Sequence, residues 1–146
     1  MSDINTLISI ENWHAAARPN PTERDFNVQL GCHFEEIAEM LETLDIDTED
    51  AAEALYWVGK LARKLKKGEA RARIVFPVSM LDALCDQIVT AVGVGYCAGM
   101  NVAGAAERVN QSNWTKFVDG RPVRDENGKI VKGPDYLAPE LGSFVS

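Results

Sequence analysis

Residues 26–44, FNVQLGCHFEEIAEMLETL, decide how this chain folds. Apolar side chains recur there every three or four positions, which is the period of one face of an α-helix. Thr22 is suited to cap such a helix, and Glu23 and Asp25 are favourable in its first turn. We therefore expect a long amphipathic helix. Its apolar stripe consists of Phe26, Leu30, Phe34, Ile37, Met40, Leu41 and Leu44.

The helical period continues on both sides of this segment. Two prolines at positions 19 and 21 end the preceding helix, Gly68 ends the following one, and Pro77 suits the first turn of the next. The pattern predicts an all-α protein, a helical bundle of four to five helices. Besides the helix that runs to about residue 44, helices are expected near residues 4–17, 48–67, 77–98 and 102–109 or slightly beyond.

The C-terminal part differs in kind. Glycine, proline and charged residues become frequent after residue 118, and the helical period is absent. Asn127-Gly128, between RPVRDE and KIVK, is typical of a hairpin turn. We expect one domain with a helical core at residues 1–118 and an irregular tail at residues 119–146 that contains a short hairpin.

The stretch Ile88 to Met100 is apolar nearly all round. A helix of that composition is normally buried on several sides. A single chain with so few helices has little surface left to cover it, so we expect helices packing across a dimer. The stretch is too short to span a bilayer, and no membrane association is expected.

Composition excludes some functions. The chain has 146 residues and a formal net charge of −7, which argues against a broad nucleic-acid-binding surface. Its three cysteines, Cys32, Cys85 and Cys97, form no CxxC pair, so neither a disulfide framework nor a zinc site is indicated. The N-terminus shows no secretion signal. A reducing, cytoplasmic location is the simplest expectation.

Two groups of carboxylates fall on two different predicted helices. Glu35, Glu36 and Glu39 form the first, and Asp82 and Asp86 form the second. Residues three or four apart share a helix face, where like charges repel each other. A solvated face explains the glutamates taken alone, but the aspartates stand at the head of the most apolar helix, where unpaired charge is costly. A Mg²⁺ ion held between the helices would explain both groups.

Three ordered motifs carry a resemblance to a known family. They are EExxE at Glu35–Glu39, DAxxD at Asp82–Asp86, and ERVNQSNWTKF at Glu107–Phe117, which is followed by a similar tail at residues 119–141. The chain resembles the MazG-like proteins of the all-α NTP pyrophosphohydrolase superfamily, in their phage- or bacterial-type branch. Many members carry ExxD in the second motif, where this chain has Ala83 in place of the glutamate.

The resemblance implies hydrolysis of a (deoxy)nucleoside triphosphate between its α and β phosphates, which yields the monophosphate and pyrophosphate. It implies a role in nucleotide pool control, in the cytoplasm of the host if the gene is carried by a phage, and a homodimer or homotetramer. Mg²⁺, or Mn²⁺ in its place, would bind Glu35, Glu36, Glu39, Asp82 and Asp86. Glu36 and Glu39 would be the catalytic residues, and Glu36 is our choice for the general base.

Four further residues are candidate contacts for the nucleotide. Asn113 and Lys116 can bind phosphate or base, although a capped helix end with a surface lysine is the alternative. Lys129 and Tyr136 can close over the nucleotide, and a solvated hairpin explains them equally well. A different class of function also stays open, namely a non-catalytic helical regulator that binds a nucleotide or a partner protein.

Overall fold

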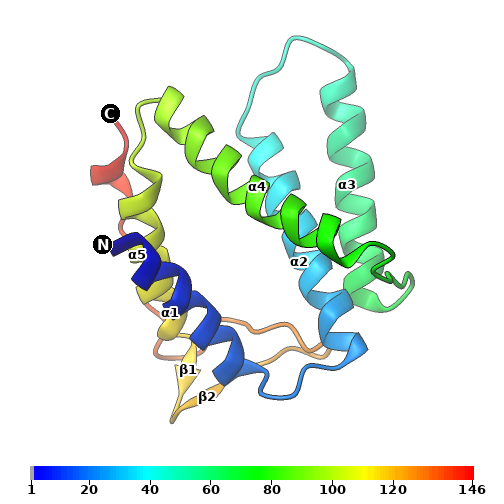
Figure 1. Cartoon of the computed structure of the whole chain (residues 1–146), viewed down its shortest axis with the longest axis vertical. Helices are drawn as coiled ribbons and strands as arrows, with labels where there is room; N and C mark the ends of the chain where they lie inside the picture. Colours follow the sequence, from blue (N-terminus) through cyan, green and yellow to red (C-terminus); the bar gives the residue numbers. More distant parts are fainter. Residues whose placement is uncertain (1) are drawn as a thin grey trace. The chain divides into compact units, whose positions relative to one another are not determined.

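The computed structural model is all-α apart from one short hairpin, which confirms the predicted fold class. It describes the backbone from Ser2 to Ser146 and the side chains from Asn5 onward. Figure 1 shows the helices in the order of the chain. The elements are α1 Ser2–Ala17, α2 Glu23–Glu42, α3 Asp50–Lys67, α4 Pro77–Cys97, α5 Val102–Trp114, strands β1 Phe117–Val118 and β2 Arg121–Pro122, and a short 3-10 helix η1 Gly142–Phe144.

The predicted helix boundaries have the expected local causes. Thr22 caps α2, since its hydroxyl oxygen accepts from the Asp25 backbone N–H at 3.1 Å, and the Asp25 carboxylate accepts from the Thr22 backbone N–H at 2.9 Å. Gly68 ends α3 in a left-handed conformation with φ 75°. Pro77 occupies the first turn of α4, where its missing N–H costs nothing.

The chain folds into two compact units. Unit 1 contains α1, α4, α5, the β1–β2 hairpin and the C-terminal segment Ile130–Ser146. Unit 2 contains α2, α3 and the short segment Arg124–Lys129. The irregular tail is therefore divided between the units, and each unit takes part of it into its own packing.

Unit 2 is built on the antiparallel pair of α2 and α3 (Figure 1). Small or medium residues are buried where the two helices meet, among them Val28, Gly31 and Ala38 on α2 and Ala62 and Leu65 on α3. Residues of this size allow the helix axes to come close together. The acidic and basic side chains are thereby left at the edges of the helix pair.

Unit 1 has an aromatic core. Trp13 and Ala17 of α1 are buried with Ile130 of the tail, and Phe117 packs against them. The Trp13 indole donates a hydrogen bond to the Asn113 carbonyl oxygen at 2.8 Å, so a buried polar group is satisfied and α1 is tied to the end of α5. Figure 1 shows α1 and α5 side by side.

The tail contains two successive turns. Strands β1 and β2 pair antiparallel, with Phe117 opposite Pro122, around a first turn that the sequence did not single out. The predicted turn at Asn127-Gly128 follows it. There the Asp125 N–H donates to the Lys129 carbonyl at 2.9 Å, and Gly128 has φ 80°. The predicted turn is therefore confirmed, while the paired strands lie one turn earlier in the chain.

Helix α4 lacks the burial that its composition predicts. Gly95 is its one buried residue, whereas Val78 and Tyr96 are 83% and 82% exposed. Burial of this stretch was expected to require a second copy of the chain, and the single chain leaves it exposed. Packing across a dimer stays a prediction. The exposed apolar residues of α4 are Val78, Leu81, Leu84, Ile88, Val89, Val92, Val94 and Tyr96.

By length and composition α4 is also able to cross a membrane, and it is the one helix in the described part of the chain of which this is true. The sequence prediction considered a shorter apolar stretch, and the helix as a whole has 21 residues. Core helices of soluble proteins reach the same length and apolarity, so this property alone assigns no location.

Candidate functional site

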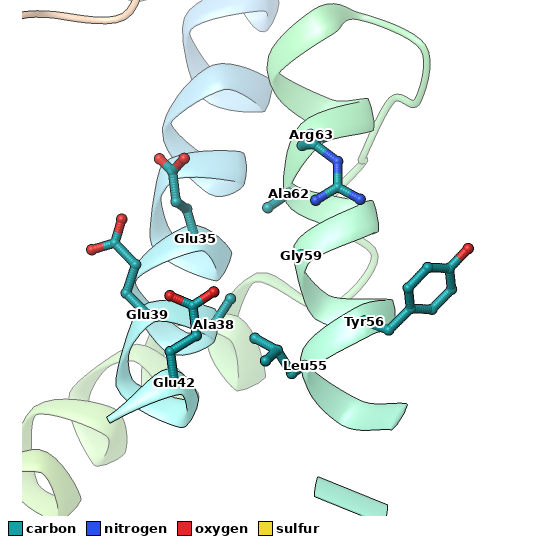
Figure 2. A pocket seen from close by; sticks show the side chains of 9 residues that line it. All are labelled: Glu35, Ala38, Glu39, Glu42, Leu55, Tyr56, Gly59, Ala62 and Arg63. Carbon is teal, nitrogen blue, oxygen red and sulfur yellow. The ribbon is translucent and has the colours of Figure 1, made fainter. Parts of the chain in front are cut away.

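A pocket of about 360 Å³ lies between α2 and α3 in unit 2. Small residues at Ala38, Gly59 and Ala62 leave room between the helices. Figure 2 shows that one side of the pocket is acidic, with carboxylates from α2, whereas Arg63 and Tyr56 stand on α3. The acidic side chains are Glu35, Glu39 and Glu42.

The three glutamates share a face because they are spaced four and three residues apart. Glu39 and Glu42 are exposed, and neither makes an ion pair with another described residue. Figure 2 shows the Tyr56 ring pointing away from the carboxylates, so the ring leaves that side of the pocket open. Hydrated carboxylates on one face can attract a divalent cation.

Glu35 has different surroundings. One of its oxygens accepts a hydrogen bond from the ammonium of Lys66, and the other accepts from Lys129 at 2.8 Å. Burial raises the pKa of the Glu35 carboxyl, but the hydrogen bonds and charges of Lys129 and Lys66 outweigh it and hold that pKa below its usual value. The bond to Glu35, opposed by burial, raises the pKa of Lys129. Glu35 and Lys129 therefore form an ion pair at neutral pH.

Arg24 of α2 connects the segments that carry the two lysines. Its guanidinium donates to the carbonyl oxygens of Leu65 at 3.1 Å and of Lys66, at the end of α3. It also donates to the Asn127 carbonyl oxygen at 3.4 Å. The last carbonyls of a helix have no partner within the helix, and a cation there also complements the helix dipole. Arg24 thus holds the end of α3 and the tail turn against α2.

The remaining predicted metal ligands are exposed carboxylates. Glu36 lies on α2, and Asp82 and Asp86 lie one turn apart on α4, in unit 1. Among the described residues, no group of three histidine, cysteine, aspartate or glutamate side chains is close enough to hold a metal ion. The glutamates and the aspartates belong to different units, and the metal site stays a prediction.

Most of the predicted nucleotide contacts lie at one place in unit 1. The Lys116 ammonium is 6.0 Å from the centre of the Tyr136 ring, and Lys132 approaches the same ring to 5.0 Å. Asn113 is adjacent, since its carbonyl oxygen accepts from the Lys116 N–H at 3.1 Å. The fourth candidate, Lys129, belongs to unit 2 with Glu35.

Sequence reasoning missed Glu42, which lines the pocket, and Lys66, which pairs with Glu35. Glu42 follows Glu39 at helical spacing, so the signal for it was present in the sequence. Lys66 stands among basic residues in the last turn of α3, a pattern that is typical of a solvated helix end. Its side chain is instead only 16% exposed and is paired with Glu35. The partners are 31 positions apart, so no local pattern reveals them.

Comparison with known proteins adds no family to this description. No protein-family model, no curated protein and no solved structure matches the chain. The functional interpretation therefore depends on the residues of the site, on their geometry and on the motif resemblance.

Proposed function

We propose that this protein hydrolyses a (deoxy)nucleoside triphosphate to the monophosphate and pyrophosphate, with Mg²⁺ as cofactor and Mn²⁺ able to replace it. The observation that carries the proposal is the acidic side of the pocket, formed by Glu35, Glu39 and Glu42, with two lysines at its edge. A metal–triphosphate complex needs carboxylates for the cation and ammonium groups for the phosphates. The choice of reaction comes from the resemblance to MazG-like proteins.

In the proposed reaction, the oxygen of a water molecule bonds to the α-phosphorus. The bond between that phosphorus and the α,β-bridging oxygen breaks, and pyrophosphate leaves with the electron pair. Glu36 takes the proton of the water as general base. A bound Mg²⁺ supplies charge neutralisation for the phosphates and lowers the pKa of a bound water. The motif resemblance implies that Glu39, Asp82 and Asp86 would hold the cation.

The nucleotide is assigned to the lysine-bearing segments. The Lys116 ammonium lies near an aromatic ring, that of Tyr136, and Asn113 offers both a donor and an acceptor. Lys129 is assigned to the phosphates, because it already faces a carboxylate oxygen at 2.8 Å and can face a phosphate oxygen equally well. The cellular role that follows is nucleotide pool control.

We further propose that the active form is a homodimer or homotetramer. The supporting observation is the exposed apolar length of α4, which a second copy of the chain would cover. Large contiguous apolar patches are rare on the surfaces of monomeric soluble proteins. Association would remove this surface from water.

Pyrophosphate release from a panel of (d)NTPs, with Mg²⁺, Mn²⁺ or a chelator, tests the proposal. We expect metal-dependent release that falls by about 10²-fold or more in Glu36→Gln and in Glu39→Gln, the usual scale for losing a general base or a ligand group. Glu53→Gln is the matched control, because Glu53 is an exposed glutamate on α3 outside the pocket.

If the wild-type protein releases no pyrophosphate from any nucleotide of the panel, the enzymatic proposal is refuted. Nucleotide binding without pyrophosphate release would instead identify the non-catalytic regulator, which binds a nucleotide or a partner protein. Isothermal titration with the same nucleotides separates these outcomes.

A further inference from the structure

Both carboxylate oxygens of Glu35 are paired with ammonium groups of the protein itself, those of Lys66 and Lys129. An oxygen that binds Mg²⁺ must point a lone pair at the metal, and a divalent cation repels ammonium groups seated on the same carboxylate. Glu39, on the next turn, makes no ion pair with the described residues. Two glutamates of one EExxE motif therefore have different electrostatic surroundings.

The backbone beneath both lysines is held in place. Lys66 stands in the last turn of α3, whose final carbonyls accept from Arg24. Lys129 ends the turn Arg124–Lys129, where the Asp125 carboxylate accepts from the N–H groups of Asn127 at 2.8 Å and Lys129 at 2.9 Å. Only the long lysine side chains then need to be oriented, and Glu35 is the group on which they meet.

The three side chains together keep a positive charge. Two ammonium groups face one carboxylate, which leaves one net positive charge at the edge of an acidic pocket. Each ammonium has three N–H donors and uses one of them on Glu35. Lys129 is 37% exposed, so an anion can reach its remaining donors.

We propose that Glu35 is a positioning residue that holds Lys66 and Lys129 together as a clamp for the phosphate chain, in place of the metal-ligand role that the motif resemblance implies. The inference takes its ligand, a triphosphate, from the proposed function. Neighbouring turns of α2 then have different roles. Glu39 attracts the cation, and Glu35 orients the ammonium groups that bind phosphate.

The test separates metal binding from phosphate binding in the full chain. Mn²⁺ binding is followed by electron paramagnetic resonance, and binding of inorganic tripolyphosphate in Mg²⁺ buffer is followed by calorimetry. For Glu35→Gln and Lys129→Met we expect tripolyphosphate affinity to fall and the KM for the nucleotide to rise, each about tenfold, the scale of one charge-assisted hydrogen bond. Mn²⁺ affinity should stay within about twofold, whereas Glu39→Gln should lose Mn²⁺.

Two further variants control for charge and folding. Lys67→Met removes a neighbouring exposed lysine from the same helix end and should leave tripolyphosphate binding unchanged. Lys129→Arg keeps a cation at the position and should retain most of the affinity that Lys129→Met loses. A purely structural role for the pair would lower the stability of all pair variants without this rescue.

Loss of Mn²⁺ binding in Glu35→Gln to the extent seen in Glu39→Gln would overturn the inference, and so would wild-type protein that does not bind tripolyphosphate. Either result can occur while the wild-type protein still hydrolyses nucleotides, so the proposed function is judged separately. If hydrolysis is absent but tripolyphosphate binding depends on Lys129 and Glu35, the clamp stands and the enzymatic proposal fails.

Discussion

Gly31 of α2 lies directly against the α3 backbone at Ala62. A Cβ atom built on Gly31 would lie 2.8 Å from the Ala62 carbonyl oxygen and 2.7 Å from the Lys66 Cγ. A carbonyl inside a helix cannot yield unless the helix itself moves. The absent side chain therefore sets the separation of the helices, and it leaves room for the Lys66 stem on its way to Glu35.

Gly31→Ala should destabilise the protein by about 1–3 kcal/mol, because overpacking outweighs the better helix propensity of alanine. Urea denaturation followed by circular dichroism measures the change. Gly59→Ala is the matched control on α3, where an added Cβ meets only the flexible Arg63 guanidinium at 3.4 Å. This control should be neutral or stabilising by up to about 1 kcal/mol. Equal effects of the two substitutions would contradict the close approach.

Arg24→Ala should destabilise unit 2 by about 1–2 kcal/mol, because it leaves the final carbonyls of α3 without their charged donor. Arg24→Lys should recover little of the loss, since an ammonium cannot reproduce the fork of a guanidinium. Arg73→Ala, at an exposed arginine without a bond to the described residues, should stay within about 0.5 kcal/mol. In Arg24→Ala, hydrogen exchange should also accelerate at the backbone N–H groups of Asn127 and Lys129. Unchanged protection of these groups would contradict the role of Arg24 in holding the tail turn.

The Glu35–Lys129 pair predicts pH dependence on two sides. The pKa of Glu35 is lowered from 4.5, so its contribution to stability is complete above 4.5 and is lost as the pH falls through the folded-state pKa. The pKa of Lys129 is raised from 10.5, so its contribution is complete below 10.5 and is lost as the pH rises through the folded-state pKa.

The difference in unfolding free energy between wild type and Glu35→Gln should therefore be largest at intermediate pH. It should shrink in acid below the ordinary carboxyl pKa and in alkali above the ordinary lysine pKa. Urea denaturation of both proteins across the pH range measures it. A constant difference across the range would mean that Glu35 is not ion-paired in solution.

Substitution of exposed apolar residues on α4 should dissociate the protein. Leu81 and Val89 are 64% and 67% exposed in the single chain. Leu81→Lys and Val89→Lys should therefore leave its helical content intact. Light scattering should find a dimer or tetramer for the wild type and a monomer for the double variant, because buried lysines are unfavourable in an apolar interface. A monomeric wild type would contradict the proposed assembly, and wild-type binding to liposomes would assign α4 to lipid instead.

Local sequence was sufficient where the cause of a structure is local. The capping box of Thr22 and Asp25, the left-handed Gly68 and the initial Pro77 each act within a few residues, and all were predictable. The tail turn at Asn127-Gly128 belongs to the same class. These signals predicted the all-α class because backbone hydrogen bonds and apolar period operate over one or two helical turns.

The candidate site was only partly predictable for the opposite reason. Glu35, Glu36 and Glu39 were visible as a group because helical spacing alone brings them to neighbouring positions. The partners of Glu35 were not visible, since Lys66 and Lys129 come from segments 31 and 94 positions away. The full extent of the exposure of α4 was also not visible, because composition reports the apolarity of a helix and not what covers it.

The amino-acid order by itself determined which segments are helical, where they start and stop, and that one helix carries a row of glutamates, since each of these follows from interactions within a few residues. Tertiary structure alone decided which charge each glutamate meets. The close packing of α2 on α3 at Gly31 and the bond of Arg24 to the tail turn bring two lysines to Glu35, whereas no lysine of the described part of the chain pairs with Glu39. Electrostatic surroundings depend on distance in space, and only the folded chain sets that distance.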